Sequence, residues 1–202
     1  MPIRSELIWT VFKKSFALNY KQNIAFEKQH ELRKQFILAN ESLTKDDKSE
    51  AIMLSNKYLD YCKVLYSKGT KRICENCQEE CLATLYCEHC IRNYIKVNIQ
   101  NWTSGNNEID DLIKNCQLNS FKPDKIIEWI PYNDLQNVKY LTKGGCSEVY
   151  TADWIDGCYE KWDYKEKQLK RSGTQTVVLK KLENVESANR SWFEEVFNLM
   201  NF

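Results

Sequence analysis

The sequence predicts a mixed α+β protein, with a helical N-terminal region that contains a cysteine knuckle and a small β-sheet region after it. Two observations lead to this prediction. Apolar residues recur at helical spacing through Cys116, whereas from Val138 onward they follow the period of strands. Two C-x-x-C pairs interrupt the helical part, and paired cysteines at this spacing are typical of a metal-binding turn.

Composition places the chain among globular proteins. Its 202 residues, 43% of them apolar, are enough for one or two small domains with cores. A net charge of +1 argues against a strong field toward nucleic acid or membrane. Charged residues interrupt the first turns, and no apolar run reaches the length of a membrane span. We therefore expect a soluble, cytoplasmic protein with neither nucleic acid nor membrane as partner. Nine cysteines, an odd number, favour thiols and a metal over a disulfide framework.

Residues 1–69 are predicted to form the first helical region. One apolar stripe comprises Leu7, Ile8, Val11, Phe12 and Phe16, and a less regular one follows from Ile24 to Ile37. A third helix is announced by Thr44 to Asp47, a variant of the capping box, and it ends near Gly69. We expect a helical hairpin or three-helix unit, which is also the expected docking region for a protein partner. His30 is expected to be a surface or hydrogen-bonded residue.

Residues 70–120 are predicted to hold a four-cysteine zinc knuckle and the helices that follow it. Each C-x-x-C turn aims two thiolates at one point, and two turns supply the tetrahedral set that Zn²⁺ prefers. The predicted ligands are Cys74, Cys77, Cys87 and Cys90. The alternatives are reduced thiols and an iron–sulfur site. Cys81 and His89 lie close enough in sequence to replace a ligand, Cys81 more readily than His89.

A structural role is expected for this zinc. Four protein ligands leave no open coordination position, and a segment this short needs the metal to build a core. Lys68, Lys71 and Arg72 either offset the negative charge of the thiolates or form a solvated approach to the knuckle. Two helices follow the knuckle. Residues 121–136 then form a linker in which Trp129 is expected to act as an anchor.

Residues 137–202 are predicted to form a small sheet and one helix. Strands are expected at 138–141, 148–154 and 176–181, and a helix at 189–200. The segment 155–173 is rich in Lys, Glu and Tyr, and we expect it to be an exposed hairpin or solvated loop. Three strands alone make a marginally stable sheet.

The segment TKGGCSEVY carries the strongest functional pattern of this sheet. Gly144 and Gly145 allow a tight turn that brings backbone N–H groups close to phosphate oxygens, and Val149 can cover an adenine ring. Lys180 ends the strand VVLK, and Glu195 follows fifteen residues later on a helical pattern. This arrangement resembles the Gly-rich loop, the strand lysine and the helix glutamate of protein kinases.

The resemblance can be followed position by position. On the family pattern G-x-G-x-x-G-x-V, Gly144 matches the second glycine and Val149 the valine. Thr142 and Ser147 stand where the family has its first and third glycines. Thr142 is β-branched and resists the dihedral angles that glycine permits.

The whole chain is similar to the kinase-like proteins of arbuscular mycorrhizal fungi. Those proteins combine a Cys-rich segment, an EWIPY-type linker and a kinase domain. The matching segments here are CENCQEECLATLYCEHC (74–90), NWTSGN (101–106), EWIPYNDL (128–135), VVLKK (177–181) and FEEV (193–196). The resemblance implies ATP as a ligand and, for residues 137–202, the first three strands and the first helix of a kinase small lobe.

Three functional hypotheses follow. The first is the N-terminal, ATP-binding portion of a protein kinase, expected to be inactive by itself because H-R-D, D-F-G and A-P-E motifs do not occur in the sequence. We expect either the front of a longer kinase or a shortened relative. The second is a zinc-stabilised protein-interaction module with a vestigial kinase segment. The third, nucleic-acid binding, lacks a basic stripe with stacking aromatic residues.

Overall fold

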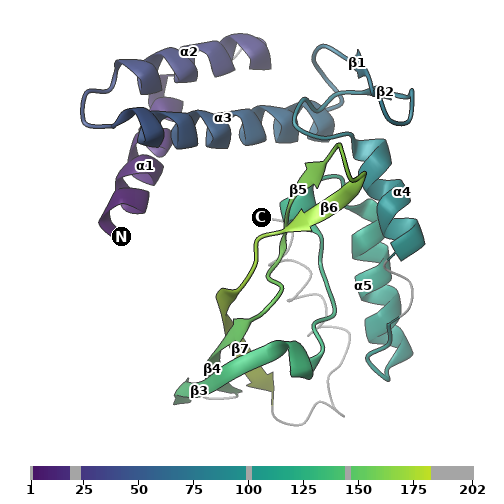
Figure 1. The fold of residues 1–202 in the computed structure, drawn as a ribbon. Coiled ribbons are helices and arrows are strands. Elements are labelled where there is room, and N and C mark those ends of the chain that lie inside the picture. Colours follow the sequence, from purple (N-terminus) through teal and green to yellow (C-terminus); the bar gives the residue numbers. More distant parts are fainter. Residues whose placement is uncertain (1, 19–23, 99–101, 144–146, 183–202) are drawn as a thin grey trace. The chain divides into compact units, whose positions relative to one another are not determined.

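The computed structural model describes residues 2–18, 24–98, 102–143 and 147–182. Within these ranges the protein is mixed α+β, as predicted, with helices α1 to α5 and strands β1 to β7 (Figure 1). The chain divides into two compact units. The first unit combines residues 1–129 with 159–170, and the second combines residues 130–158 with 171–202.

Three helices begin the first unit. They are α1 (Pro2–Ser15), α2 (Phe26–Ala39) and α3 (Lys45–Leu65), with a short 3-10 turn at Phe16–Leu18, and α2 lies alongside α3 (Figure 1). The predicted capping box is confirmed. Thr44 Oγ1 accepts from the N–H of Asp47 at 3.3 Å, and the Asp47 carboxylate accepts from the N–H of Thr44 at 2.9 Å. Both exchanges satisfy N–H groups that the start of a helix leaves free.

The core of this helical part consists of apolar side chains. We call it the helical cluster, and its members are Ile8, Val11, Ile37, Leu43 and Ala51. Arg33 is buried beside it, with its guanidinium over the rings of Phe16 at 5.0 Å and Tyr58 at 5.2 Å. His30 Nδ1 lies 3.0 Å from the hydroxyl of Ser55, which agrees with the expected hydrogen-bonded role.

The cysteine-rich part follows α3. It contains the short antiparallel strands β1 (Arg72–Ile73) and β2 (Glu80–Cys81), then α4 (Glu88–Asn98) and α5 (Asn107–Asn119). Asn106 caps α5 by accepting from the N–H groups of Glu108 and Ile109. A 3-10 turn at Pro123–Lys125 comes next, and Trp129 stacks on Trp102 with ring centroids 6.1 Å apart, which fits the expected anchor.

A hairpin from far along the chain completes the first unit. It consists of β5 (Tyr159–Asp163) and β6 (Gln168–Arg171). The hairpin was expected, but its exposure to solvent was wrong, because Tyr159, Trp162 and Leu169 are each less than 9% exposed. The segment contains many charged residues, so its overall composition predicted an exposed segment. The few side chains that enter the core could not be recognised from that composition.

The second unit contains an antiparallel sheet in the order β3-β4-β7. Its strands are β3 (Leu135–Lys143), β4 (Ser147–Trp154) and β7 (Gln175–Leu182), and a 3-10 turn (Tyr132–Asp134) leads into β3. All three predicted strands are confirmed; β4 and β7 are one and two residues longer than expected, and β3 has nine residues where four were expected. In the described part of the chain, no helix combines the length and apolar character that a membrane crossing needs.

Candidate metal centre

The first cysteine pair lies on a tight turn between β1 and β2. The carbonyl of Cys74 accepts from the N–H of Gln78 at 2.9 Å, and the N–H of Cys74 donates to the carbonyl of Glu79 at 2.9 Å. Gln78 closes the turn with a φ of 62°, in the left-handed region that residues other than glycine seldom adopt. The turn brings Cys74 and Cys77 to the same side of the loop.

The second cysteine pair lies at the start of α4. The carbonyl of Cys87 accepts from the N–H of Ile91 at 3.1 Å, so Cys87 immediately precedes the helix and Cys90 lies in its first turn. The N-terminus of a helix carries partial positive charge, which favours negatively charged sulfur. The start of α4 therefore brings both cysteines of this pair to the same end of the helix.

The four sulfurs converge. Cys74 Sγ lies 3.7 Å from Cys90 Sγ, and Cys77 Sγ lies 3.7 Å from Cys87 Sγ. All four atoms lie within 4.8 Å of one another, and the four cysteines form no disulfide. Two sulfurs bound to one zinc at about 2.3 Å lie about 3.8 Å apart in a tetrahedron. We call these four residues the sulfur cluster; their arrangement can hold a metal ion such as zinc.

Burial shapes the acidity of these thiols. Cys74 and Cys87 are fully buried, and Cys90 is 4% exposed. Burial raises the pKa of Cys87 and raises that of Cys90 to about 11. At Cys74 burial acts in the same direction, but hydrogen bonds from the backbone N–H groups of Cys77 and Asn76, together with those from the Cys87 and Cys90 thiols, outweigh it and lower the pKa to about 7. A metal cation would therefore have to displace thiol protons as it binds.

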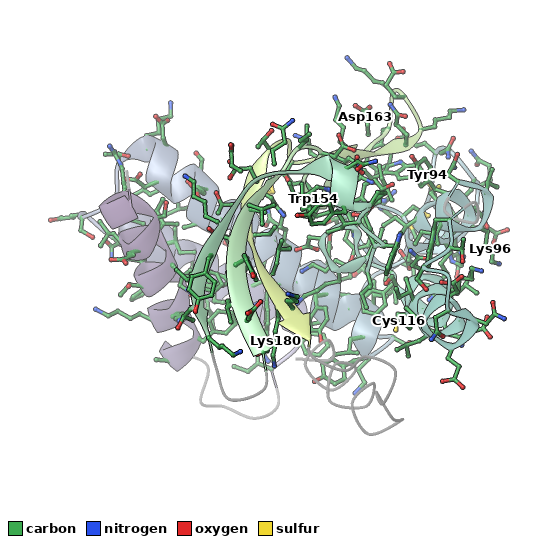
Figure 2. The ribbon with its side chains drawn as sticks, turned by 90° about the horizontal axis from the view of Figure 1, so that it is seen from below. Tyr94, Lys96, Cys116, Trp154, Asp163 and Lys180 are labelled. Carbon is green, nitrogen blue, oxygen red and sulfur yellow. The ribbon has the colours of Figure 1, made fainter. Side chains whose placement is uncertain are left out.

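A core surrounds the sulfur cluster. It includes Ala83, Tyr86, Ile91, Ile95 and Ile126 from the first 129 residues and Tyr159, Trp162 and Leu169 from the hairpin. Tyr94 on α4 meets the hairpin with its ring edge-on to Trp162 at a centroid distance of 6.0 Å. Figure 2 labels Tyr94 and, in the hairpin, Asp163 at the end of β5. The hairpin thus forms part of the wall around the cysteines.

Arg72 ties three segments together near the sulfur cluster. Its guanidinium donates to the carbonyls of Ala83 at 2.8 Å and Tyr86 at 2.7 Å and to the hydroxyl of Tyr164 at 2.9 Å. The sequence left two roles open for Arg72, charge compensation at the cysteines or a place in a solvated segment. Its contacts favour the first role. Lys71 instead pairs with exposed Glu80 at 2.7 Å.

Asp60 attaches the cysteine-rich loop to α3. Its fully buried carboxylate accepts from the N–H and the hydroxyl of Thr84 at 2.8 and 2.9 Å, and from the N–H of Leu85 at 2.8 Å. A carboxylate that accepts backbone N–H groups fixes a loop more firmly than a neutral acceptor does. Sequence reasoning missed this residue, since one aspartate on a helical stripe carries no distinguishing pattern.

The two substitute ligands differ in position. His89 Nε2 lies 3.0 Å from the carbonyl of Glu80, so this nitrogen is engaged with the backbone. Cys81 is 1% exposed, and its sulfur lies within 4.8 Å of Cys87 Sγ and a Glu88 carboxylate oxygen. Of the two, Cys81 is thus the one whose potential ligand atom lies close to Cys87; its capacity to replace a ligand stays a prediction.

The kinase-like residues lie on the sheet of the second unit, as far as the structure describes them. Gly144, Gly145 and Glu195 lie outside the described residues, and so does the predicted pairing of Lys180 with Glu195. Val149 is the direct partner of Lys180 across β4 and β7, and Thr142 is the partner of Val149 across β3 and β4. Directly opposed residues point to the same face of a sheet.

This face of the sheet is accessible. Val178, two residues before Lys180, shares its face and is 68% exposed, and Lys180 itself is exposed. Figure 2 shows Lys180 on β7 and Trp154 on β4, near opposite ends of the sheet. The opposite face carries the ion pair between Lys181 and Glu148 at 3.2 Å. Ser147, which stands at the family's third glycine, is 6% exposed at the start of β4.

Comparisons with models of known protein families, with curated proteins and with solved structures return no significant match.

Proposed function

We propose that the chain is a zinc-stabilised module in which Cys74, Cys77, Cys87 and Cys90 hold one structural zinc ion. The carrying observation is the pair of sulfur–sulfur distances of 3.7 Å, close to the separation of thiolates on one tetrahedral zinc. The zinc would hold the turn after β1, the start of α4 and the hairpin in one core. Large apolar side chains exposed on the first three helices, Trp9, Leu38 and Met53 among them, support a protein partner for that region.

The test is metal content and its structural effect. Purified protein is expected to contain about one tightly bound zinc per chain, and chelation is expected to remove amide protection around the cysteines. Cys87→Ser should lose the zinc, whereas Cys116→Ser, in α5 and outside the sulfur cluster, should keep it. Metal-free protein with unchanged thermal melting would overturn the proposal.

A second function is proposed for the sheet, namely the nucleotide-binding portion of a protein kinase small lobe. Its support is the register that puts Thr142, Val149 and Lys180 in one row on one face, with the exposed Val178 beside them. This is the set that would meet an adenine ring and phosphates if the kinase resemblance holds. Gly144, Gly145 and Ser147 would supply the loop, and Glu195 the ion-pair partner of Lys180.

The sheet offers a matched pair of variants for this test. ATP is expected to bind with a dissociation constant on the order of 1 mM, or about 4 kcal/mol, and NMR shifts of the Gly144 and Gly145 amides would report it. Lys180→Ala should weaken binding, whereas Lys181→Ala, on the opposite face, should not. Equal effects of the two variants, or no shifts at millimolar ATP, would refute nucleotide binding and leave the zinc proposal intact.

A further inference from the structure

A second group of metal-ligating side chains adjoins the sulfur cluster. Cys81 Sγ, Cys87 Sγ and a carboxylate oxygen of Glu88 lie within 4.8 Å of one another. Their residues are 1%, 0% and 7% exposed. Cys81 ends β2, where it pairs with Arg72 of β1, and Glu88 is the first residue of α4. Two separate elements therefore bring these atoms together, and Cys87 belongs to both groups.

The two carboxylate oxygens of Glu88 differ in their hydrogen bonding. Oε1 accepts from the N–H of Leu82 at 2.8 Å, which orients the carboxylate. Oε2 is buried and has no hydrogen-bond partner among the described residues. A buried carboxylate oxygen without a partner is costly, and such oxygens are usually paired or bound to a metal. The free oxygen belongs to the same residue that contributes to the three-ligand group.

Charge favours a cation at this place. A zinc ion with four thiolates carries a formal charge of about −2. Arg72, the strand partner of Cys81, directs its guanidinium to two carbonyls and the Tyr164 hydroxyl. A second divalent ion would offset the negative charge that remains.

We propose that Cys81, Cys87 and Glu88 form a second metal position, in which the thiolate of Cys87 bridges the two ions. The ion would be divalent and thiophilic, Zn²⁺ or its substitute Cd²⁺, because two of the three ligands are sulfurs. Binding displaces the proton of the Cys81 thiol to solvent, while the sulfur of Cys87 uses a further lone pair. This inference rests on the proposed zinc centre, since the two positions share Cys87. The second ion binds more weakly, because it has three protein ligands instead of four.

The experiment is a titration of metal-free protein with ¹¹³Cd²⁺, followed by NMR of the cadmium nucleus and by metal counting after gel filtration. Wild type is expected to show two cadmium signals that appear in sequence, and coupling between them would report the shared sulfur. Cys81→Ser and Glu88→Gln should each lose or weaken the second signal by about tenfold or more in affinity and keep the first. Gln at position 88 retains an oxygen for the N–H of Leu82. Cys116→Ser is the matched control and should keep both signals.

The other outcomes show which of the two metal positions is wrong. A single cadmium per wild-type chain, or a second signal that survives unchanged in Cys81→Ser and Glu88→Gln, overturns the second position and leaves the four-cysteine centre standing. No tight cadmium in wild type, or a first signal that persists in Cys77→Ser, overturns the four-cysteine centre itself. If Cys81→Ser does not fold, Glu88→Gln alone decides, because it changes no sulfur.

Discussion

The sulfur cluster and the helical cluster are two cores of the same compact unit, and they are built on different physics. The helical cluster consists of apolar side chains, among them fully buried Ile37 and Ala51, so hydrophobic burial is the interaction expected to stabilise it. The sulfur cluster has four ionisable thiols at its centre. Buried charges are unfavourable unless they are paired. We therefore expect one core to be stable without a ligand and the other to depend on a cation.

Helix α3 connects the two cores. Ala51, toward its start, belongs to the helical cluster, and Val64, near its end, packs against the core around the cysteines. Asp60 holds the loop at Thr84 and Leu85 to the same end of the helix. Removal of the metal should therefore destabilise α3 only at the end that makes these contacts.

The largest expected effect comes from removing the metal. Chelation or Cys87→Ser should abolish amide protection in residues 72–95 and 159–169, because binding of a structural zinc contributes about 10–16 kcal/mol to such folds. Residues of α1, α2 and α3 around the helical cluster should stay protected. Hydrogen exchange followed by mass spectrometry measures both regions at once. Simultaneous loss of protection in both would mean that the two cores are not energetically separate.

The next largest effect concerns the hairpin. Trp162→Ala removes a side chain that is 6% exposed in the core around the cysteines, and about 3–5 kcal/mol of stability should be lost. Val178→Ala, at a position 68% exposed, should change stability by less than about 0.5 kcal/mol. Urea denaturation of zinc-loaded protein followed by circular dichroism gives both values. Similar values for the two variants would show that the hairpin does not contribute to the core.

A smaller effect is expected where α3 meets the cysteine-rich loop. Asp60→Asn places an amide NH₂ where the carboxylate accepts N–H groups, so about 2–3 kcal/mol should be lost. Zinc affinity should fall as well, since the loop that carries Thr84 and Leu85 leads directly to Cys87. Competition with a chromophoric chelator measures the affinity. Asp46→Asn, at an exposed position of the same helix, is the control and should leave the affinity unchanged.

The features that could be predicted from the sequence are those with a local pattern. Helical periodicity, the capping box at Thr44 and the C-x-x-C spacing each depend on residues close in sequence, and the structure agrees with them. The buried hairpin could not be found in this way. Trp162 lies 72 residues beyond Cys90, and its burial depends on a long-range contact that neither period nor composition encodes. Asp60 was missed for the same reason, because its partners are 24 and 25 residues away.

The two cores should unfold at different pH values as the solution is acidified. The helical cluster should be the less sensitive of the two. A zinc ion held by the sulfur cluster would leave as the thiolates take up protons, so we expect that core to be lost first. Asp47 caps α3, the helix that carries Ala51 of the helical cluster, and its pKa is lowered to about 2 by hydrogen bonds from Arg4 and then from Thr44. A carboxyl group with a lowered pKa stabilises the fold when it is ionised. Its contribution is therefore complete above about pH 5 and lost as the pH falls from about 4 toward 2.

Far-UV circular dichroism and hydrogen exchange between pH 6 and pH 2 would measure these steps on the intact chain. Wild type should release zinc first and should lose the helices α1 to α3 only at lower pH. Asp47→Asn should be less stable at pH 6 and should show a flatter dependence between about pH 4 and 2, because the titrating carboxylate is gone. Asp46→Asn, in the same helical turn but exposed, should follow wild type. If the helices unfolded together with zinc release in every variant, the helical cluster would depend on the metal as much as the sulfur cluster does.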